Sequence, residues 1–148
     1  MSLDRFFHIK LKEQVFIMFS DTWLKQFLKL WNNSLELVTL LRQENFSAVI
    51  GYGLVEDRYP LFVLVINSGR LVKIMRYRQQ SLDWDFRASS ELWESMIENP
   101  PGIPQLGLAY TQKRLICRKG NYSLMLKNSN LSKAFAASFK IMHQVEMT

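Results

Sequence analysis

The chain has 148 residues, of which 48% are apolar and 13% aromatic, and it carries a formal net charge of +6. This length and apolar content suit one hydrophobic core and are too small for two, so we expect residues 1–148 to form a single domain. The one cysteine excludes an intrachain disulfide, and no apolar run reaches the roughly 18 residues that a membrane-spanning helix needs.

Two helices are expected near the start of the chain. Residues 1–13 show no clear periodicity, and we treat residues 1–20 as an N-terminal extension. Residues 22–30 carry apolar side chains at helical spacing, and Asp21 can cap the start of this amphipathic helix. A second helix is expected over residues 35–42.

The pattern then changes to that of strands. Residues 46–55, 60–67 and 71–78 are rich in Val, Ile, Tyr and Phe, which fit a pleated surface. Polar turn residues separate the three runs, and Asn67 to Arg70 are typical of a tight hairpin. We therefore expect three antiparallel strands in a meander.

A fourth strand is predicted over residues 82–89, where apolar and polar side chains alternate with a period of two. The buried face of this strand would carry Leu82, Trp84, Phe86 and Ala88. The opposite face would carry Asp83, Asp85 and Arg87 as a solvated ladder of charges.

The last third of the chain predicts helices around one further strand. Ser89 or Ser90 can cap a helix that residues 99–102, with two prolines, bring to an end. A short helix over residues 103–110 then leads into an edge strand over residues 113–119. The final helices are expected at the positions 122–126 and 131–142, the last one capped by Ser129 or Asn130. Together these elements predict an α+β fold, a five-stranded, predominantly antiparallel sheet with helices packed on one face.

No group of residues in the sequence is typical of catalysis or metal binding. His8 and His143 have no ligand-like spacing to each other or to Cys117, which has no base beside it and is expected to be a packed thiol. Gly51 and Gly53 lie inside a strand, which indicates a bulge or the close approach of a bulky group rather than a phosphate-binding turn. We therefore expect no enzymatic activity, no cofactor and no metal.

The positive charge is concentrated towards the C-terminus. Residues 1–98 hold 12 Lys and Arg against 12 Asp and Glu, whereas residues 99–148 hold seven against Glu146 alone. This charge could be ordinary solubilising charge, or it could bind an anionic membrane or a nucleic acid. No nucleic-acid motif matches, so we expect no nucleic-acid partner. Charged residues interrupt residues 4–13 where a secretory signal would be apolar, so we expect a cytoplasmic protein.

Three stretches of the sequence resemble the sterol carrier protein type two family, in particular its small bacterial and archaeal single-domain members. Residues 23–34 (WLKQFLKLWNNS) are similar to the family's opening helix, and residues 85–93 (DFRASSELW) to its acidic-apolar strand followed by a capped helix. Residues 115–120 (LICRKG), followed by residues 124–126 (LML), resemble its last strand, glycine and terminal helix. The chain departs from the family over residues 99–105, and its first 20 residues have no counterpart there.

The resemblance implies a hydrophobic cavity between the sheet and the helices that holds a lipid or another hydrophobic molecule without catalysis. Large apolar walls would also account for the aromatic content. The candidate ligand-binding residues are Trp84, Phe86, Trp93, Met96, Leu106, Leu115, Leu124, Leu131, Phe135 and Phe139.

Two functional hypotheses follow. In the first, the chain binds and transfers a lipid, the final helix gates the cavity, and basic residues dock on an anionic membrane. These membrane-surface candidates are Lys113, Arg114, Lys119, Lys127, Lys133 and Lys140. In the second, the chain is an accessory module that presents a lipophilic intermediate, such as an isoprenoid quinone precursor, or a partner helix to an enzyme. An enzyme with a concealed polar site is a third alternative, and the oligomeric state stays open.

Overall fold

The computed structural model describes residues 19–148. The expectations for residues 1–18, including His8 and nearly all of the N-terminal extension, lie outside the described residues. Two helices open the described part, α2 (Asp21–Asn33) and α3 (Leu35–Gln43). Ser20 caps α2 by accepting a hydrogen bond from the backbone N–H of Trp23 at 3.2 Å. The prediction of Asp21 as the cap was wrong by one residue, because the Ser20 hydroxyl already occupies that role.

Five strands form a mixed sheet with the order β3-β2-β1-β4-β5. The strands are β1 (Ala48–Leu54), β2 (Phe62–Asn67), β3 (Arg70–Arg76), β4 (Trp84–Ala88) and β5 (Ile116–Lys119). The predicted meander of β1, β2 and β3 is confirmed, and Ser68 and Gly69 in its hairpin turn both have positive φ.

The sheet is less uniformly antiparallel than the sequence predicted, because β4 pairs with β1 in parallel. Residues 77–83 return the chain from the edge strand β3 to the far side of β1, so β4 runs in the same direction as β1. The other pairs among the described strands are antiparallel, and β5 is an edge strand as expected.

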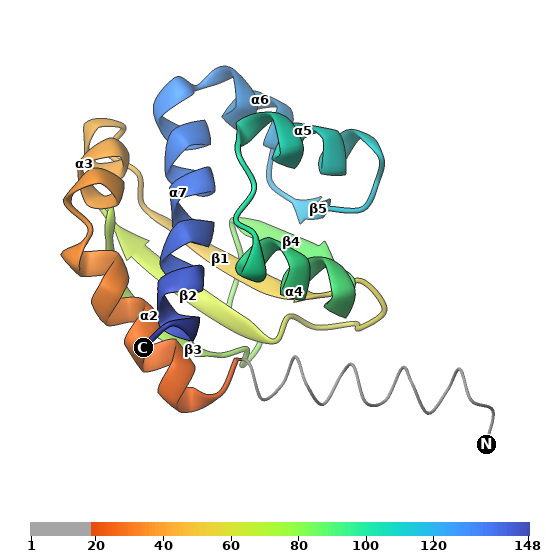
Figure 1. Cartoon of the computed structure of the whole chain (residues 1–148), viewed down its shortest axis with the longest axis horizontal. Helices are drawn as coiled ribbons and strands as arrows, with labels where there is room; N and C mark the ends of the chain where they lie inside the picture. Colours follow the sequence, from red (N-terminus) through yellow and green to blue (C-terminus); the bar gives the residue numbers. More distant parts are fainter. Residues whose placement is uncertain (1–18) are drawn as a thin grey trace.

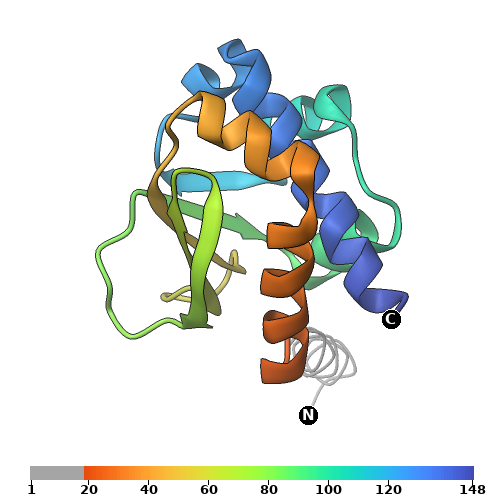
Figure 2. The ribbon, with the colours of Figure 1, turned by 90° about the vertical axis from the view of Figure 1, so that its left-hand side faces the viewer.

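The remaining helices are α4 (Ser90–Glu98), α5 (Ile103–Thr111), α6 (Tyr122–Lys127) and α7 (Ser129–Glu146). Ser89 caps α4, and this helix ends before the two prolines as predicted. The cap of α7 is Asn128, whose side chain accepts from the N–H of Leu131, rather than Ser129 or Asn130. All helices of the described part lie on one face of the sheet, and α7 runs through the middle of their layer (Figures 1 and 2).

On the other face of the sheet, the connection between β1 and β2 lies over β1 and β4. Gly51 and Gly53 of β1 lie beside Asp85 and Arg87 of β4 on this face. The prediction of a solvated charge ladder is therefore wrong for β4, since only 1% of Arg87 is exposed and Asp85 is also buried. The strand pattern indicated the correct two faces, but the covering loop comes from a distant part of the sequence.

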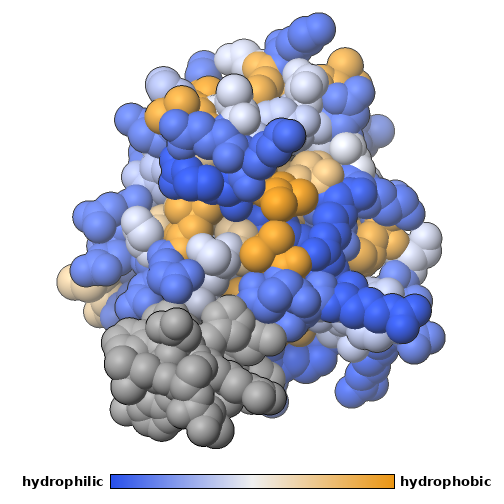
Figure 3. All heavy atoms as spheres, turned by 90° about the vertical axis from the view of Figure 1, so that its right-hand side faces the viewer, coloured by the Kyte–Doolittle hydropathy of each residue, from blue (hydrophilic) through white to orange (hydrophobic). Residues whose placement is uncertain are grey.

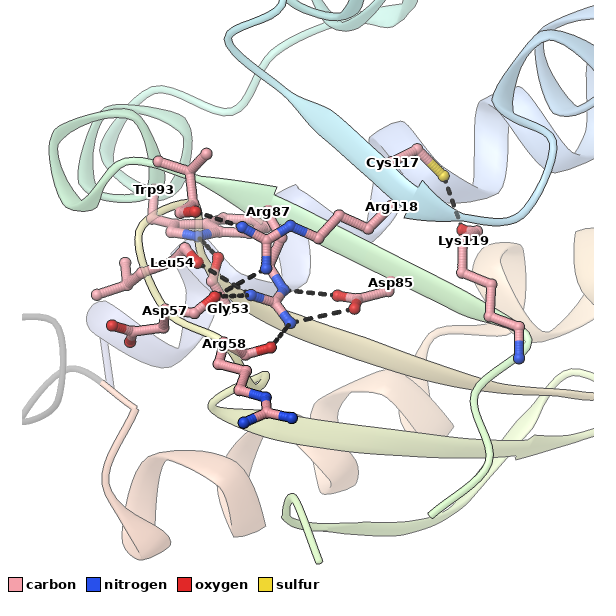
Figure 4. A network of polar contacts seen from close by, with 11 residues as sticks. Gly53, Leu54, Asp57, Arg58, Asp85, Arg87, Trp93, Cys117, Arg118 and Lys119 are labelled. Carbon is pink, nitrogen blue, oxygen red and sulfur yellow. Dashed lines mark hydrogen bonds and ion pairs between the residues drawn. The ribbon is translucent and has the colours of Figure 1, made fainter. Parts of the chain in front are cut away.

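Arg87 satisfies its whole guanidinium group inside this face (Figure 4). Its Nε and Nη2 atoms donate to the two carboxylate oxygens of Asp85 at 2.7 and 3.1 Å. Nη1 donates to the carbonyls of Leu54 at 3.1 Å and Asp57 at 2.7 Å, and Nη2 also reaches the carbonyl of Arg58 at 3.3 Å. A buried arginine is tolerated only with such a complete set of partners, so this contact fixes the loop to the sheet.

The two glycines of β1 allow the covering loop to lie close to the sheet. A Cβ atom on Gly53 would come within 2.8 Å of Pro60 Cα, and one on Gly51 would come within 3.0 Å of the Pro60 ring. The expected close approach of a bulky group at these glycines is confirmed. On the same stretch of β1, the carbonyl of Gly53 accepts a hydrogen bond from Trp93 Nε1 at 2.8 Å, which ties α4 to the sheet.

Replacing the buried carboxylate should strongly destabilise the fold. We expect Asp85→Ala to lower the free energy of unfolding by about 3–5 kcal/mol, because Arg87 is left buried without its counter-ion. Urea unfolding followed by circular dichroism measures this change. The control is Asp21→Ala, which removes a 3.5 Å ion pair with Arg76 at a side chain that is 84% exposed and should cost no more than about 1 kcal/mol. Equal losses in the two variants would contradict the assigned role of Asp85.

A methyl group at Gly53 should also be destabilising. We expect Gly53→Ala to cost roughly 1–3 kcal/mol, because backbone atoms of the covering loop have to move away. The matched control is Gly107→Ala in α5, where the added Cβ meets no atom within 4 Å and where alanine favours the helix. Thermal unfolding should show a lower midpoint for the first variant and an equal or higher midpoint for the second. A Gly53 variant as stable as the wild type would show that the loop is not held closely.

Candidate functional site

An apolar cavity lies between the sheet and the helix layer. The sheet contributes its helix-facing side chains, α7 lies opposite, and α2, α3 and α6 contribute one residue each. The wall is formed by Trp31, Leu41, Phe46, Ile50, Tyr52, Ile66, Trp84, Phe86, Met125, Leu131, Ala134, Phe135 and Ser138. No charged side chain is among these residues, so the cavity suits a neutral, apolar occupant.

Aromatic rings make up much of this wall. The ring of Phe86 stacks on Phe135 with centroids 4.9 Å apart and on Trp84 at 5.8 Å. Tyr52 lies on the other side of Phe86, with centroids 5.8 Å apart. These rings come from two adjacent strands and α7, so the sheet and the helix layer meet through them.

Two of the polar groups in the wall are already engaged within the protein. Trp31 Nε1 donates to the carbonyl of Gly69 at 3.0 Å, and Ser138 Oγ donates to the carbonyl of Phe135 at 2.6 Å. Burial raises the pKa of Tyr52, so its hydroxyl is neutral at physiological pH. The cavity therefore presents apolar surface and neutral groups.

The cavity is small in this structure, with a volume of about 30 Å³. This volume accommodates one or two water molecules, because a buried water molecule needs at least about 10–15 Å³. The sequence led us to expect space for a hydrocarbon chain, and the stacked rings of Phe86 and Phe135 reduce that space. A lipid would enter only if the walls moved apart.

The ten candidate ligand-binding residues fall into three groups in the structure. Trp84, Phe86, Leu131 and Phe135 line the cavity. Five others are buried elsewhere in the core, namely Trp93, Met96, Leu106, Leu115 and Phe139. Leu124 faces outward and is 65% exposed, whereas its neighbour Met125 lines the cavity.

Several cavity residues were missed by reasoning from the sequence. Trp31, Phe46 and Tyr52 are typical core residues when seen singly, and the sequence does not show which core residues border a void. One available signal was the alternation in β1, which places Tyr52 on the face opposite Gly51 and Gly53. That face is the one the helices cover.

The six candidate membrane-surface residues are all exposed, but they do not form one patch. Lys133 and Lys140 of α7 border a surface groove of about 330 Å³, and Arg114 borders a second groove of similar size beyond the Pro100–Gly102 segment. Lys119 is the last residue of β5 and Lys127 the last residue of α6. Figure 3 views the side of the molecule with α4, α5 and β5 and shows apolar side chains among hydrophilic ones. Among residues 19–148, no helix is long and apolar enough to cross a membrane.

The candidate nucleophile and ligand residues give no reactive cluster in the described part of the chain. Cys117 is half-buried, its Sγ contacts the carbonyl of Lys119 at 2.9 Å, and burial raises the pKa of its thiol to about 11. His143 is partly buried, with its ring Nδ1 3.0 Å from the carbonyl of Ile97. No group of three or more His, Cys, Asp and Glu within residues 19–148 could hold a metal ion.

Comparison with known proteins gives matches in structure but not in sequence. No family model matches the chain, and no curated protein matches its sequence. The crystal structure of sterol carrier protein 2 superposes with a TM-score of 0.68 at 14% identity, covering 85% of this chain and 97% of that chain.

Two further solved structures agree with this match. The protein TT1886 from Thermus thermophilus, described as possibly a sterol carrier protein, has a TM-score of 0.65 at 13% identity and covers 86% of this chain and 88% of its own. The ubiquinone synthesis protein UbiJ-SCP2 has a TM-score of 0.54 at 13% identity, with coverage of 84% and 88%. The chain therefore has the fold of sterol carrier protein 2, as its resemblance to that family implied.

Proposed function

We propose that the chain is a cytosolic, non-catalytic carrier that binds a lipid or another lipophilic molecule between its sheet and α7. The observation that carries this proposal is the cavity wall, which is apolar, rich in aromatic rings and free of charged side chains. The fold supports it, because the similar structures include sterol carrier protein 2. Each methylene group buried in such a site contributes about 0.8 kcal/mol, so a hydrocarbon chain gains affinity without polar recognition.

A carrier with a cavity of this small volume needs a wall that moves, and α6 has the features of such a wall. It is a helix of six residues, which is too short to be stable by itself. Its Met125 side chain lines the cavity, and it is held to α7 by Ser132 Oγ, which donates to the carbonyls of Met125 and Leu126 at 2.9 and 3.2 Å. Displacing α6 would open the cavity while the sheet stays intact. From the sequence we expected the final helix to gate the cavity. We now propose α6 as the gate.

The outer side of α6 suits an anionic membrane surface. Leu124 is exposed on this helix, and so are Lys127 at the end of the helix and Lys119 at the end of β5, which precedes it in the chain. Leu108 is also exposed on α5, which packs against α6 through the rings of Tyr110 and Tyr122, 4.5 Å apart. An apolar side chain flanked by lysines can insert between lipid headgroups while the lysines bind phosphate groups. Membrane contact would then act on the helix that closes the cavity.

A second candidate function is that of an accessory module for an enzyme that acts on a lipophilic intermediate. The similarity to UbiJ-SCP2, a ubiquinone synthesis protein, favours an isoprenoid quinone precursor as that intermediate. The open groove between α3, α7 and the Pro100–Gly102 segment, bordered by Glu36 and Lys133, offers a place for a partner helix. Recovery of an enzyme with the chain, lost on substituting groove residues, would favour this function over transfer.

Filling the cavity should weaken ligand binding without unfolding the chain. We expect the wild type to bind the neutral apolar dye Nile red, and Ala134→Leu to bind it at least about tenfold more weakly, since the added side chain points into the cavity. The control is Ala137→Leu, on the same helix but in the wall of the surface groove, which should bind as the wild type does. Circular dichroism confirms that both variants fold. Equal dye binding by the two variants would place the binding site elsewhere.

Membrane docking should depend on the lysines beside α6. We expect sedimentation with phosphatidylglycerol vesicles but not with phosphatidylcholine vesicles, and release at high salt. The variant with Lys119→Gln and Lys127→Gln should bind about tenfold or more weakly, and Leu124→Ser should also weaken binding. The matched control replaces Lys25 and Lys29 of α2 by Gln. Binding that does not distinguish the two vesicle types, or that falls equally in both lysine variants, would contradict docking through α6.

A further inference from the structure

The outer face of α7 is open between α3 and the segment that joins α4 to α5 (Figure 1). This opening, the α7 groove, has a volume of about 330 Å³ and shares no lining residue with the apolar cavity. Its other walls are Glu36 of α3 and residues 100–103. The residues that α7 contributes are Lys133, Ala136, Ala137 and Lys140. Their spacing of i, i+3, i+4 and i+7 puts all four on one face of the helix.

The middle of the α7 groove is apolar and has small side chains. Because alanine side chains are short, another backbone can approach α7 closely at Ala136 and Ala137. The wall formed by Pro100, Pro101 and Ile103 is apolar as well. A groove of this kind accommodates the apolar ridge of one further helix, and such helices are recognised through residues at i, i+3, i+4 and i+7.

The charges of the α7 groove favour an acidic occupant. Lys133 and Lys140 lie on either side of the alanine pair, about 10.5 Å apart along the axis, because a helix rises 1.5 Å per residue. Both lysines are exposed, and neither makes an ion pair or a hydrogen bond within residues 19–148. The lining holds these two basic residues against Glu36 alone. Carboxylates at the same spacing on a partner would therefore complement the groove.

We propose that the α7 groove binds an amphipathic helix of a partner protein, with two acidic residues seven positions apart and apolar residues between them. This inference rests on the accessory-module function proposed above and adds the chemistry of the partner to it. A second copy of the chain is disfavoured, because two identical basic grooves facing each other would repel. A membrane is also disfavoured, because a flat surface does not reach into a groove between the two lysines.

A designed peptide tests this pairing. The probe is a fluorescein-labelled peptide of about 21 residues, rich in alanine so that it is helical, with two Glu seven positions apart and leucines at the third and fourth positions between them. Fluorescence anisotropy measures its binding to the full chain, which should weaken at high salt. A peptide with Gln in place of both Glu should bind about fivefold more weakly or less. A peptide that carries both Glu on the opposite face should lose the same affinity.

Variants of the chain locate the peptide on the groove. The variant with Lys133→Gln and Lys140→Gln should bind the probe about fivefold or more weakly, whereas Lys25→Gln with Lys29→Gln in α2 should bind it as the wild type does. Ala137→Leu fills the groove and should weaken binding at least about tenfold. Circular dichroism checks that each variant folds, and Nile red binding should be unchanged in all of them.

The outcomes separate this inference from the carrier proposal. Equal binding of the Glu and Gln peptides, or equal losses in the two lysine variants, would overturn it. A dimer in sedimentation velocity that Ala137→Leu abolishes would assign the groove to a second copy instead, and vesicle binding lost in the Lys133 and Lys140 variant without any peptide binding would assign it to a membrane. If Nile red binds and the peptide does not, this inference fails and the carrier function stands. If the peptide binds and Nile red does not, the carrier function fails and this inference stands.

Discussion

The buried contact between Arg87 and Asp85 is the interaction on which the rest of the structure depends. It holds the connection between β1 and β2 against the sheet, because the guanidinium group that binds Asp85 also donates to the carbonyls of Leu54, Asp57 and Arg58. Arg118 of β5 strengthens the contact by donating to the carbonyls of Val55 and Asp57 (Figure 4). Desolvation of two charges is costly, and only the complete set of partners offsets it. The cavity lies on the opposite, helix-covered face of the sheet.

The sequence predicted most of the elements because their signals are local. Helix stripes, the two prolines after α4 and the hairpin turn at Ser68 and Gly69 each act over a few residues. The parallel pairing of β4 with β1 was missed, since no local pattern specifies which strand becomes a neighbour. The burial of Asp85 and Arg87 was missed for the same reason. Alternating charges on a strand are typical of a solvated face, and the carbonyls of the covering segment that bind Arg87 lie 29 to 33 residues earlier in the chain.

The sequence predicted an apolar cavity as the kind of site, but not the size of that cavity. An aromatic-rich α+β chain favours a lined cavity, and four of the ten candidate ligand-binding residues, Trp84, Phe86, Leu131 and Phe135, line the cavity of the structure. Its volume of about 30 Å³ could not be predicted, because it depends on how the rings of Phe86 and Phe135 pack against each other. Binding of a lipid as proposed would require this small apolar void to widen.

The central claim is that this void expands to hold a lipophilic molecule. Native mass spectrometry of the protein freshly purified from cells, under conditions that preserve non-covalent complexes, tests it most directly. We expect a fraction of the protein to carry an added mass that organic extraction removes and that belongs to a neutral lipophile. Finding only the mass of the bare chain, both after purification and after incubation with a total lipid extract, would contradict this claim.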